Sequence, residues 1–270
     1  MPSSEGAMRV TLLGTGTSTG IPVIGCTCRV CQSNDPRDKR TRCACLIDVD
    51  GLHLLVDVGP DFRTQALRAG LTRIDAVLLT HHHFDHVVGL DDLRPFFFDN
   101  ATPITCYARP DTADTLRDMF RYIFIDRAYP GVANLRMEAV VAPFRIAGRY
   151  DISRSVMVTP IEAFHGKLPL HGYRVGRFAY LTDTSHIPPE SMALLEDLDV
   201  LVLDALRHEA HPSHFTIEQA VEVAQRLGAR QTYLIHMTHH ILHMEEEVRL
   251  PAGIELAYDG LSFEVRPGAR

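Results

Sequence analysis

The segment Thr80-His81-His82-His83-Phe84-Asp85-His86 constrains the fold of this chain most strongly. It places five side chains that can bind metal within six residues, directly after an apolar run at residues 74–79. A short apolar run rich in β-forming residues predicts a buried strand. Open α/β folds carry their chemistry at the ends of such strands, where a rigid sheet edge holds the side chains. The segment therefore predicts a metal site at a strand end.

The spacing of the ligands within this segment divides them into two pairs. His81 and His83 lie two residues apart and can project to the same side of an extended chain, whereas Asp85 and His86 follow where a helix is expected. Neutral imidazole and carboxylate suit zinc, manganese or iron. Two cations held about 3.5–4 Å apart can share one activated water. One short segment can therefore supply ligands to two metals.

Three further strand-like runs each end in one candidate ligand. His165 follows the run beginning at Met157, Asp183 follows the run beginning at Phe178, and His236 follows residues 232–235. The alternative is that the histidines form a polar surface loop or an adventitious metal binder. Ligands at three other predicted strand ends argue for a built site instead.

The HxHxDH pattern followed by a lone His, Asp and His resembles the metallo-β-lactamase fold superfamily. This resemblance implies an α/β fold, a four-layer αββα sandwich with two metals at one edge between its sheets. It also implies a ligand set: His81, His83 and His165 for one metal, Asp85, His86 and His236 for the other, and Asp183 as the bridge. His82 falls on the variable position and is not an expected ligand.

A cysteine cluster, Cys26-Thr27-Cys28-Arg29-Val30-Cys31, lies in a short loop at residues 25–31. Three thiolates this close predict a structural zinc, and His239 is the candidate for the fourth ligand of a tetrahedral site. The alternatives are reduced cysteines of an intracellular protein, or a disulfide with one cysteine left over. Cys43, Cys45 and Cys106 are expected to be buried core residues.

The motifs GTGTSTGIP, GCTCRVC, THHHFDH, LTDTS and HMTHH together resemble the PhnP family of phosphodiesterases of bacterial phosphonate breakdown, over residues 10–265. That resemblance implies hydrolysis of a small cyclic, ribosyl or nucleotide-like phosphodiester. It also implies a homodimer with two active-site cations, zinc or manganese, and one structural zinc per chain. Accessory proteins of coenzyme PQQ synthesis share the cysteine cluster, so the cluster does not identify the substrate.

The family resemblance also indicates that His214 is catalytic and protonates the leaving oxygen, with Asp85 as the second catalytic residue. From the residues alone, His214 could instead mark the start of the helix expected at residues 216–227. His208 and His211 lie close by in sequence, and their roles could be exchanged with that of His214. In the predicted mechanism, the bridging water has its pKa lowered to about 7 and attacks phosphorus in line.

Other functions use the same ligand set. A lactonase or thioesterase would direct the activated water at a carbonyl, and a PQQ-type accessory protein would not be catalytic. A tRNA 3′-processing endonuclease needs an RNA-gripping arm, which we do not find. The formal net charge of −7 also argues against nucleic acid as a partner. The basic cluster at residues 37–42 is expected to be a solvated loop.

Length and composition predict one hydrolase domain spanning residues 1–270. The chain is 46% hydrophobic, enough for a single large core, and no linker-like stretch divides it. The glycines at 14, 16 and 20 do not have dinucleotide-loop spacing. Asp57 ends a strand; the resemblance to the metallo-β-lactamase superfamily implies that it supports the metal ligands from behind, and the alternative is an ordinary turn residue. The first residues lack the features of a secretory signal, and no apolar run is long enough to span a membrane, so a cytoplasmic location is expected.

Overall fold

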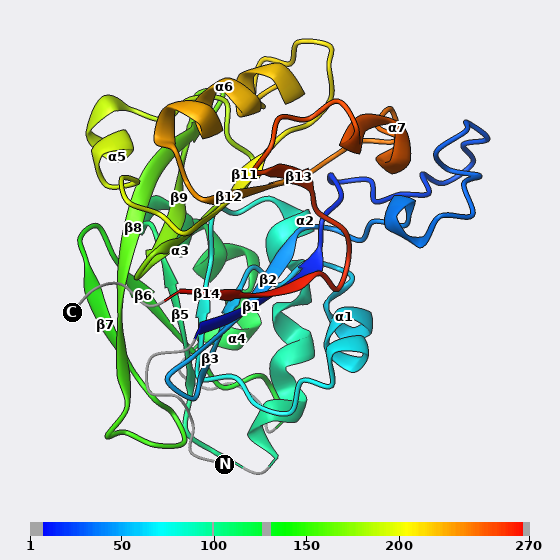
Figure 1. Ribbon diagram of the computed structural model, residues 1–270. Helices are drawn as coiled ribbons and strands as arrows, with labels where there is room; N and C mark the ends of the chain where they lie inside the picture. The colour runs from blue at the N-terminus through cyan, green and yellow to red at the C-terminus, as the bar shows by residue number, and fades with distance from the viewer. Residues whose placement is uncertain (1–7, 99, 126–130, 267–270) are drawn as a thin grey trace, which may run out of the picture.

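The computed structural model describes residues 8–98, 100–125 and 131–266, which form two seven-stranded sheets packed face to face (Figure 1). The first sheet has the order β14-β1-β2-β3-β4-β5-β6, with β3 to β6 parallel. Its strands are β1 (Met8–Gly14), β2 (Ala44–Val49), β3 (Leu52–Val56), β4 (Ala76–Leu78), β5 (Ile104–Ala108), β6 (Leu135–Ala139) and β14 (Ser262–Val265).

The second sheet has the order β13-β12-β11-β10-β9-β8-β7, with β10 to β13 parallel. Its strands are β7 (Phe144–Ala147), β8 (Ser155–His165), β9 (Leu168–Val175), β10 (Phe178–Leu181), β11 (Val200–Asp204), β12 (Gln231–Ile235) and β13 (Ile254–Leu256). Each sheet therefore combines antiparallel strands with a parallel set, and the parallel set points its carboxyl ends to one edge.

The helices lie on the outer faces of the sheets or in the connections at the ligand-bearing edge. The α-helices are α1 (Phe62–Ala69), α2 (Phe84–Val87), α3 (Pro110–Met119), α4 (Arg121–Phe124), α5 (Pro189–Ala193), α6 (Ile217–Leu227) and α7 (His243–Glu247), and the 3-10 helices are η1 (Pro36–Asp38) and η2 (Val88–Phe97). No helix among the described residues has the length and apolar character needed to cross a bilayer.

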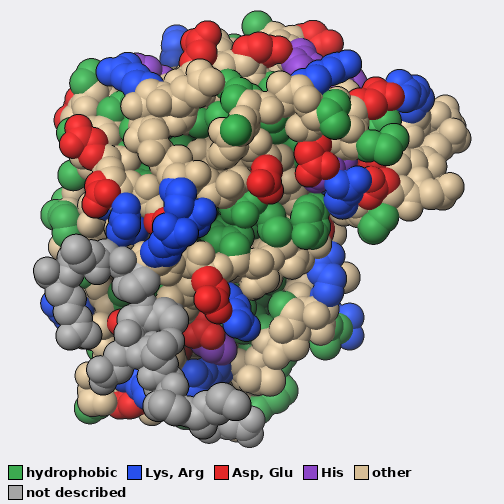
Figure 2. All heavy atoms as spheres, viewed as in Figure 1, with side chains coloured by type: hydrophobic (Ala, Val, Ile, Leu, Met, Phe, Trp, Pro, Cys, Tyr) green, Lys and Arg blue, Asp and Glu red, His purple; other side chains and the backbone are tan. Residues whose placement is uncertain are grey.

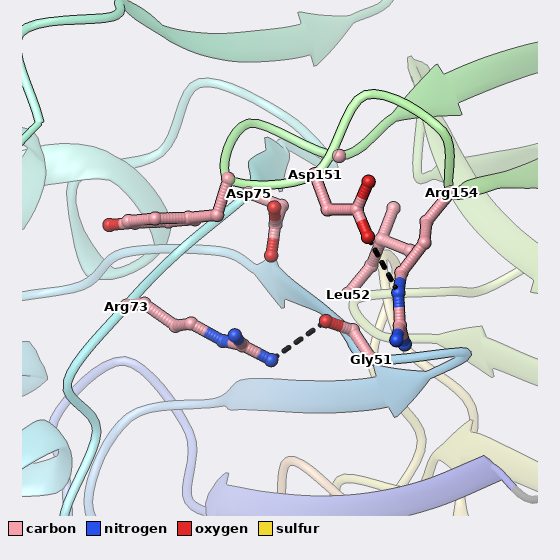
Figure 3. A pocket seen from close by; sticks show the side chains of 8 residues that line it. Gly51, Leu52, Arg73, Asp75, Asp151 and Arg154 are labelled. Carbon is pink, nitrogen blue, oxygen red and sulfur yellow. Dashed lines mark hydrogen bonds and ion pairs between the residues drawn. The ribbon is translucent and has the colours of Figure 1, made fainter.

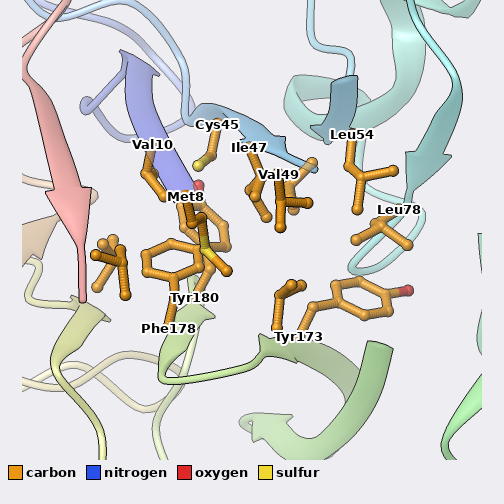
Figure 4. Packing of buried hydrophobic residues seen from close by; sticks show 14 of the residues in the cluster. Met8, Val10, Cys45, Ile47, Val49, Leu54, Leu78, Tyr173, Phe178 and Tyr180 are labelled. Carbon is orange, nitrogen blue, oxygen red and sulfur yellow. The ribbon is translucent and has the colours of Figure 1, made fainter. Parts of the chain in front are cut away.

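The core between the sheets is built from the inward-facing residues of the strands in both sheets (Figure 4). Tyr173, Phe178 and Tyr180 of the second sheet are fully buried against residues of the first sheet such as Ile47 and Leu54. The burial of apolar side chains between the sheets, worth about 25 cal/mol per Å² of surface removed from water, is the main contribution that holds the sheets together.

A second and a third core lie outside the sheets, beneath the helices. Phe62 of α1 and Leu116 of α3 pack against the outer face of the first sheet, and Ile217 and Ala220 of α6 pack against the outer face of the second. The layer order is therefore αββα, which confirms the predicted sandwich. The helices α3 and α4 are separated at Phe120, whose backbone leaves helical geometry.

The loop between β1 and β2 projects from the sandwich beside α7 (blue beside orange-red in Figure 1). It packs on a small apolar cluster of its own, in which Ile21, Val30 and Cys31 are buried. The face drawn in Figure 2 mixes acidic and basic side chains without a continuous basic surface.

Candidate metal centre

The predicted ligands gather at the edge where the strands of both sheets end. Asp57 follows β3, Asp183 lies two residues beyond β10, and His236 directly follows β12. These three residues have positive φ angles of 61°, 54° and 65°, respectively. A left-handed backbone costs a residue other than glycine about 1–3 kcal/mol, and such conformations cluster at functional sites. The chain turns sharply at each strand end, which keeps the side chains at this edge.

Asp57 organises the histidine segment from behind. Its Oδ1 accepts a hydrogen bond from the Thr80 N–H (2.9 Å), and its Oδ2 accepts from the Thr80 hydroxyl (2.8 Å) and from His86 Nδ1 (2.7 Å). Since Nδ1 of His86 donates to this carboxylate, its Nε2 keeps the lone pair. A side chain on Gly59 would collide with the Asp85 carbonyl, so glycine allows this close approach. The supporting role predicted for Asp57 agrees with these contacts.

One group of candidate ligands consists of Asp85, His86, Asp183 and His236, whose ligand atoms all lie within 4.8 Å of one another. His86 Nε2 is 3.1 Å from Asp183 Oδ1 and 3.3 Å from Asp85 Oδ2. His236 Nε2 is 3.3 Å from Asp183 Oδ1. Both Nε2 atoms are buried and neither makes a hydrogen bond among the described residues. Buried nitrogens without hydrogen bonds that converge on carboxylate oxygens fit a bound cation.

A second group contains His81 and His83, together with the other oxygen of Asp183. His81 Nε2 lies 3.0 Å from His83 Nδ1 and 3.8 Å from Asp183 Oδ2. His165 adjoins this group, since its ring centroid is 5.1 Å from that of His83, and its Nδ1 donates to the Ser213 carbonyl at 2.8 Å. Asp183 therefore presents one oxygen to each group, the arrangement expected of a bridging ligand.

The electrostatics of the cluster favour the metal-binding forms of His81, His83 and Asp183 and draw positive charge to His86. Burial lowers the pKa of His81 and His83, which keeps these imidazoles neutral. Burial would raise the pKa of Asp183, but His236 and His86 hold it well below its ordinary value. For His86, burial acts to lower the pKa, yet Asp183, Asp57 and Asp85 raise it. The carboxylates thus attract positive charge to His86 Nε2, where a cation can replace a proton.

His214 lies beside this cluster and is held by Asp204, the last residue of β11. The His214 Nδ1 is 3.2 and 3.3 Å from the two oxygens of Asp204, which also accepts from the Asp183 N–H at 3.1 Å. Burial raises the pKa of Asp204 to about 8, although His236 acts against this. Burial lowers the pKa of His214, although Asp183 raises it. Carboxyl and imidazole form a buried pair able to hold a proton beside the metal cluster.

Sequence reasoning missed Asp204. The available signal was an acidic residue ending a fully apolar strand, Val-Leu-Val-Leu-Asp, at a fourth strand end beside the predicted ligands. The residue that caps the start of α6 is Thr216 and not His214. The Thr216 side chain accepts a hydrogen bond from the Gln219 N–H in a capping box. The two neighbouring histidines differ from His214. His208 is an exposed partner of Glu218 and Glu246, and His211 lies 5.1 Å from His214 between ring centroids.

The predicted cysteine site is brought together across 208 residues or more of sequence. His239 Nδ1 lies 3.2 Å from Cys26 Sγ and 3.6 Å from both Cys28 and Cys31 Sγ, and the four ligand atoms lie within 4.8 Å of one another. A backbone hydrogen bond from Cys31 lowers the pKa of Cys28 to about 6. A Cys₃His set with one acidic thiol fits a tetrahedral zinc.

The remaining cysteine predictions hold among the described residues. All six cysteines are free thiols, so the disulfide alternative is not realised in this structure. Cys43, Cys45 and Cys106 are fully buried in the cores of the sandwich, as expected.

The solvated loop expected at residues 37–42 is partly wrong. Arg40 and Asp38 have exposed fractions of only 1% and 0%, and Arg40 Nη2 lies 3.0 Å from Asp38 Oδ1. The guanidinium also donates to the Ile241 carbonyl at 3.0 Å. Charge composition alone could not reveal this, because only Asp38 is near in sequence and the carbonyl partners of Arg40 come from the other end of the chain.

A pocket of about 200 Å³ lies at the opposite end of β3 and β4 (Figure 3). It is lined by Arg73, Asp75, Asp151 and Arg154, with Leu52 at its wall. Arg73 donates to the Gly51 carbonyl, and Arg154 pairs with Asp151. Because β3 and β4 run from this pocket toward Asp57 and Thr80, it is separate from the metal cluster.

Comparison with known proteins identifies the class. The family model described as "Beta-lactamase superfamily domain" matches residues 53–237, more than half of the chain. Together with the αββα sandwich, this match defines a hydrolase of the metallo-β-lactamase fold.

Three relatives each cover at least 94% of this chain, and two of them are more than 40% identical to it. A solved structure described as "a New Diphosphatase from the PhnP Family" is 42% identical, with a TM-score of 0.88 over 96% of this chain and 97% of that one. An octanoyltransferase of Porphyromonas gingivalis is 45% identical over 94% of this chain, which spans only 51% of that protein. A ribonuclease Z of Halorubrum lacusprofundi is 26% identical over 94% of this chain and 93% of that protein. The chain belongs to the beta-lactamase superfamily and, within it, to the PhnP family.

Proposed function

We propose that this protein is a phosphodiesterase that hydrolyses a small phosphodiester with two divalent cations. His81, His83 and His165 would hold one cation, and Asp85, His86 and His236 the other, with Asp183 shared between them. The observation that carries the proposal is the arrangement of Asp183, whose two oxygens face two separate ligand groups beside the proton-holding pair of His214 and Asp204. The Cys₃His group would hold a structural zinc.

The donor set supports two cations on chemical grounds. The described residues leave the Nε2 atoms of His86 and His236 buried without hydrogen bonds. When bound, two cations supply an activated water with a pKa near 7 and neutralise the phosphoryl oxygens. The protein's own contribution is to fix the ligands from behind, through Asp57 on His86 and through Ser213 on His165.

His214 would protonate the oxygen that leaves phosphorus. Its Nδ1 faces Asp204, so its Nε2 is the atom available to a substrate. An alkoxide is a poor leaving group, and a positioned general acid contributes about 10²- to 10⁴-fold to its departure. In a diphosphate the leaving group is a phosphate with a second pKa near 6, which departs with little help. The same site can therefore cleave both linkages, with His214 mattering most for the ester.

The diphosphate bond belongs in the proposed substrate range because the 42% identical relative is described as a diphosphatase. Each phosphorus of a diphosphate substituted at both ends carries two bridging oxygens, as the phosphorus of a phosphodiester does. Attack by the same water in line with the leaving oxygen would cleave it.

A second candidate is hydrolysis of an acyl thioester. The observation that favours it is the relative named octanoyltransferase, about half of which this chain matches. An activated water can attack a carbonyl as well as phosphorus. On this reading the product would be a free acid and a thiol.

The test is turnover on a matched panel: a ribosyl cyclic phosphodiester, a linear aryl phosphodiester, a substituted diphosphate, an aryl phosphomonoester and an octanoyl thioester. Zinc- and manganese-loaded protein would be compared, with Asp183→Asn as the inactive control. The proposal predicts diester or diphosphate cleavage well above monoester and thioester rates. Cleavage of the thioester alone would establish the second candidate. No detectable turnover of any of the five substrates would reject both the phosphodiesterase and the thioesterase proposals.

A further inference from the structure

The two candidate metal sites share one short piece of chain. His236 belongs to the two-cation site and His239 to the Cys₃His group, and they are only three residues apart. His236 also has the left-handed φ of 65°, which a histidine adopts only when its surroundings impose it. Whatever holds residues 236–241 in place therefore acts on both sites.

The upstream side of this segment is held by backbone contacts with the loop after β1. The Thr15 carbonyl accepts a hydrogen bond from the His236 N–H at 2.8 Å, and Thr17 N–H donates to the Met237 carbonyl at 3.2 Å. Thr15 is in turn fixed by the buried Asp259, which accepts from its N–H and its hydroxyl at 3.0 and 2.9 Å.

The downstream side is held by the buried guanidinium of Arg40. Its Nη1 donates to the carbonyls of Thr238 (3.4 Å) and Ile241 (3.0 Å), which flank His239. Asp38 pairs with the same guanidinium and accepts from the His243 N–H at 2.9 Å, which fixes the start of α7. A Cβ on Gly16 would lie 2.8 Å from the Arg40 carbonyl, so the loop and Arg40 are in close backbone contact.

From these contacts we infer that Arg40 is a positioning residue that couples the two metal sites, so that zinc in the Cys₃His group tightens cation binding at His236. A zinc bound to Cys26, Cys28, Cys31 and His239 anchors His239 to the projecting loop. Arg40 transmits that anchorage to the backbone on both sides of His239. Without zinc, His236 can relax toward an ordinary backbone conformation and leave its cation with a weaker ligand.

The inference rests on the two-cation site of the proposed function, but its test needs no turnover. Manganese binding is followed by the electron paramagnetic resonance signal of free Mn²⁺, in protein freed of active-site cations. The samples are wild type that retains zinc in the Cys₃His group, Cys28→Ser, Arg40→Met and the double variant. One of two manganese ions should bind about tenfold more weakly in each single variant, equal to about 1.4 kcal/mol. The loss of manganese affinity in the double variant should be smaller than the product of the two single losses, because both substitutions act through residues 236–241.

The matched control is Arg29→Met. Arg29 also joins the projecting loop to α7, through Glu245, but this pair is exposed, with 75% of the Arg29 side chain accessible. Its removal should leave both manganese affinities unchanged, and Arg40→Lys should fall between wild type and Arg40→Met.

Manganese affinities within twofold of wild type in Cys28→Ser would overturn the coupling. Should Arg40→Met fail to fold, wild-type protein stripped of its thiolate-bound zinc by a mercurial reagent provides the same comparison. Coupled manganese binding in a protein inactive on every phosphate substrate would reject the proposed function and leave the coupling standing.

Discussion

Replacing His214 with alanine should slow the enzyme to a degree that depends on the leaving group. For a ribosyl cyclic phosphodiester the leaving alkoxide is strongly basic, near the pKa of water, about 15.7. Loss of the general acid should then lower kcat/KM by about 10²- to 10⁴-fold, or about 2.7–5.5 kcal/mol of transition-state stabilisation. For an aryl diester or a diphosphate, whose leaving groups are much less basic, the same substitution should cost less than about tenfold.

We expect His214→Ala to leave the predicted metal ligands in place. Asp204 keeps its hydrogen bonds from the N–H groups of Asp183 and Phe215, at 3.1 and 3.2 Å.

The assay compares kcat/KM for both leaving-group types in wild type and variant, with bound metal measured on the same samples. His211→Ala is the matched control, since that histidine lies 5.1 Å from His214 between ring centroids and contacts Ser213 instead of Asp204. Equal losses on both substrates, or metal loss in the variant, would refute the assignment of His214 as a general acid.

Three other predictions concern the metals and the pH dependence of stability. Asp183→Asn should lower active-site metal content and turnover together, because one side chain faces both ligand groups; metal analysis showing full occupancy would contradict the bridge. Cys28→Ser should lower the zinc count by one per chain, and an unchanged count would reject the structural-zinc site. His208→Gln should lower the melting temperature at pH 6 but not at pH 9. Partial burial lowers the pKa of His208, but hydrogen bonds to Glu218 and Glu246 raise it overall. A raised folded-state pKa stabilises below the unfolded value of about 6.5, and this stability is lost as pH rises through the folded-state pKa. Since His208 is partly exposed, the expected loss of stability at pH 6 is about 0.2–1 kcal/mol. A loss of stability that is larger at pH 9 than at pH 6 would contradict this prediction.

The convergence of the candidate metal ligands could be predicted, because each candidate follows an apolar run that marks a strand end. The HxHxDH segment, His165, Asp183 and His236 converge for the reason the sequence indicates, since strand ends meet at one edge of the sandwich. The four-layer fold was predicted from the resemblance to the metallo-β-lactamase superfamily. It is confirmed by the cores beneath α1, α3 and α6.

The contacts that could not be predicted join residues without a local pattern. Asp204 ends an apolar strand, which places it at the ligand-bearing edge, but only the folded chain shows its contacts with His214 and Asp183. Arg40 lies in a basic stretch typical of a solvated loop, yet its partners are backbone carbonyls about 200 residues away, 198 to Thr238 and 201 to Ile241. Long-range partners of this kind decide whether a charged residue is buried, and no local sequence signal carries them.

The two-cation mechanism can be tested by restoring metal to protein whose active-site cations have been removed while the Cys₃His zinc is retained. Phosphodiester or diphosphate hydrolysis would be measured as manganese or zinc is added in steps, with Asp183→Asn in parallel. A two-cation mechanism predicts a wild-type rate that rises until two equivalents are bound, and a rate that stays near zero in Asp183→Asn. A rate that saturates at one equivalent would contradict the two-cation site, and hydrolysis that persists without added metal would contradict the mechanism.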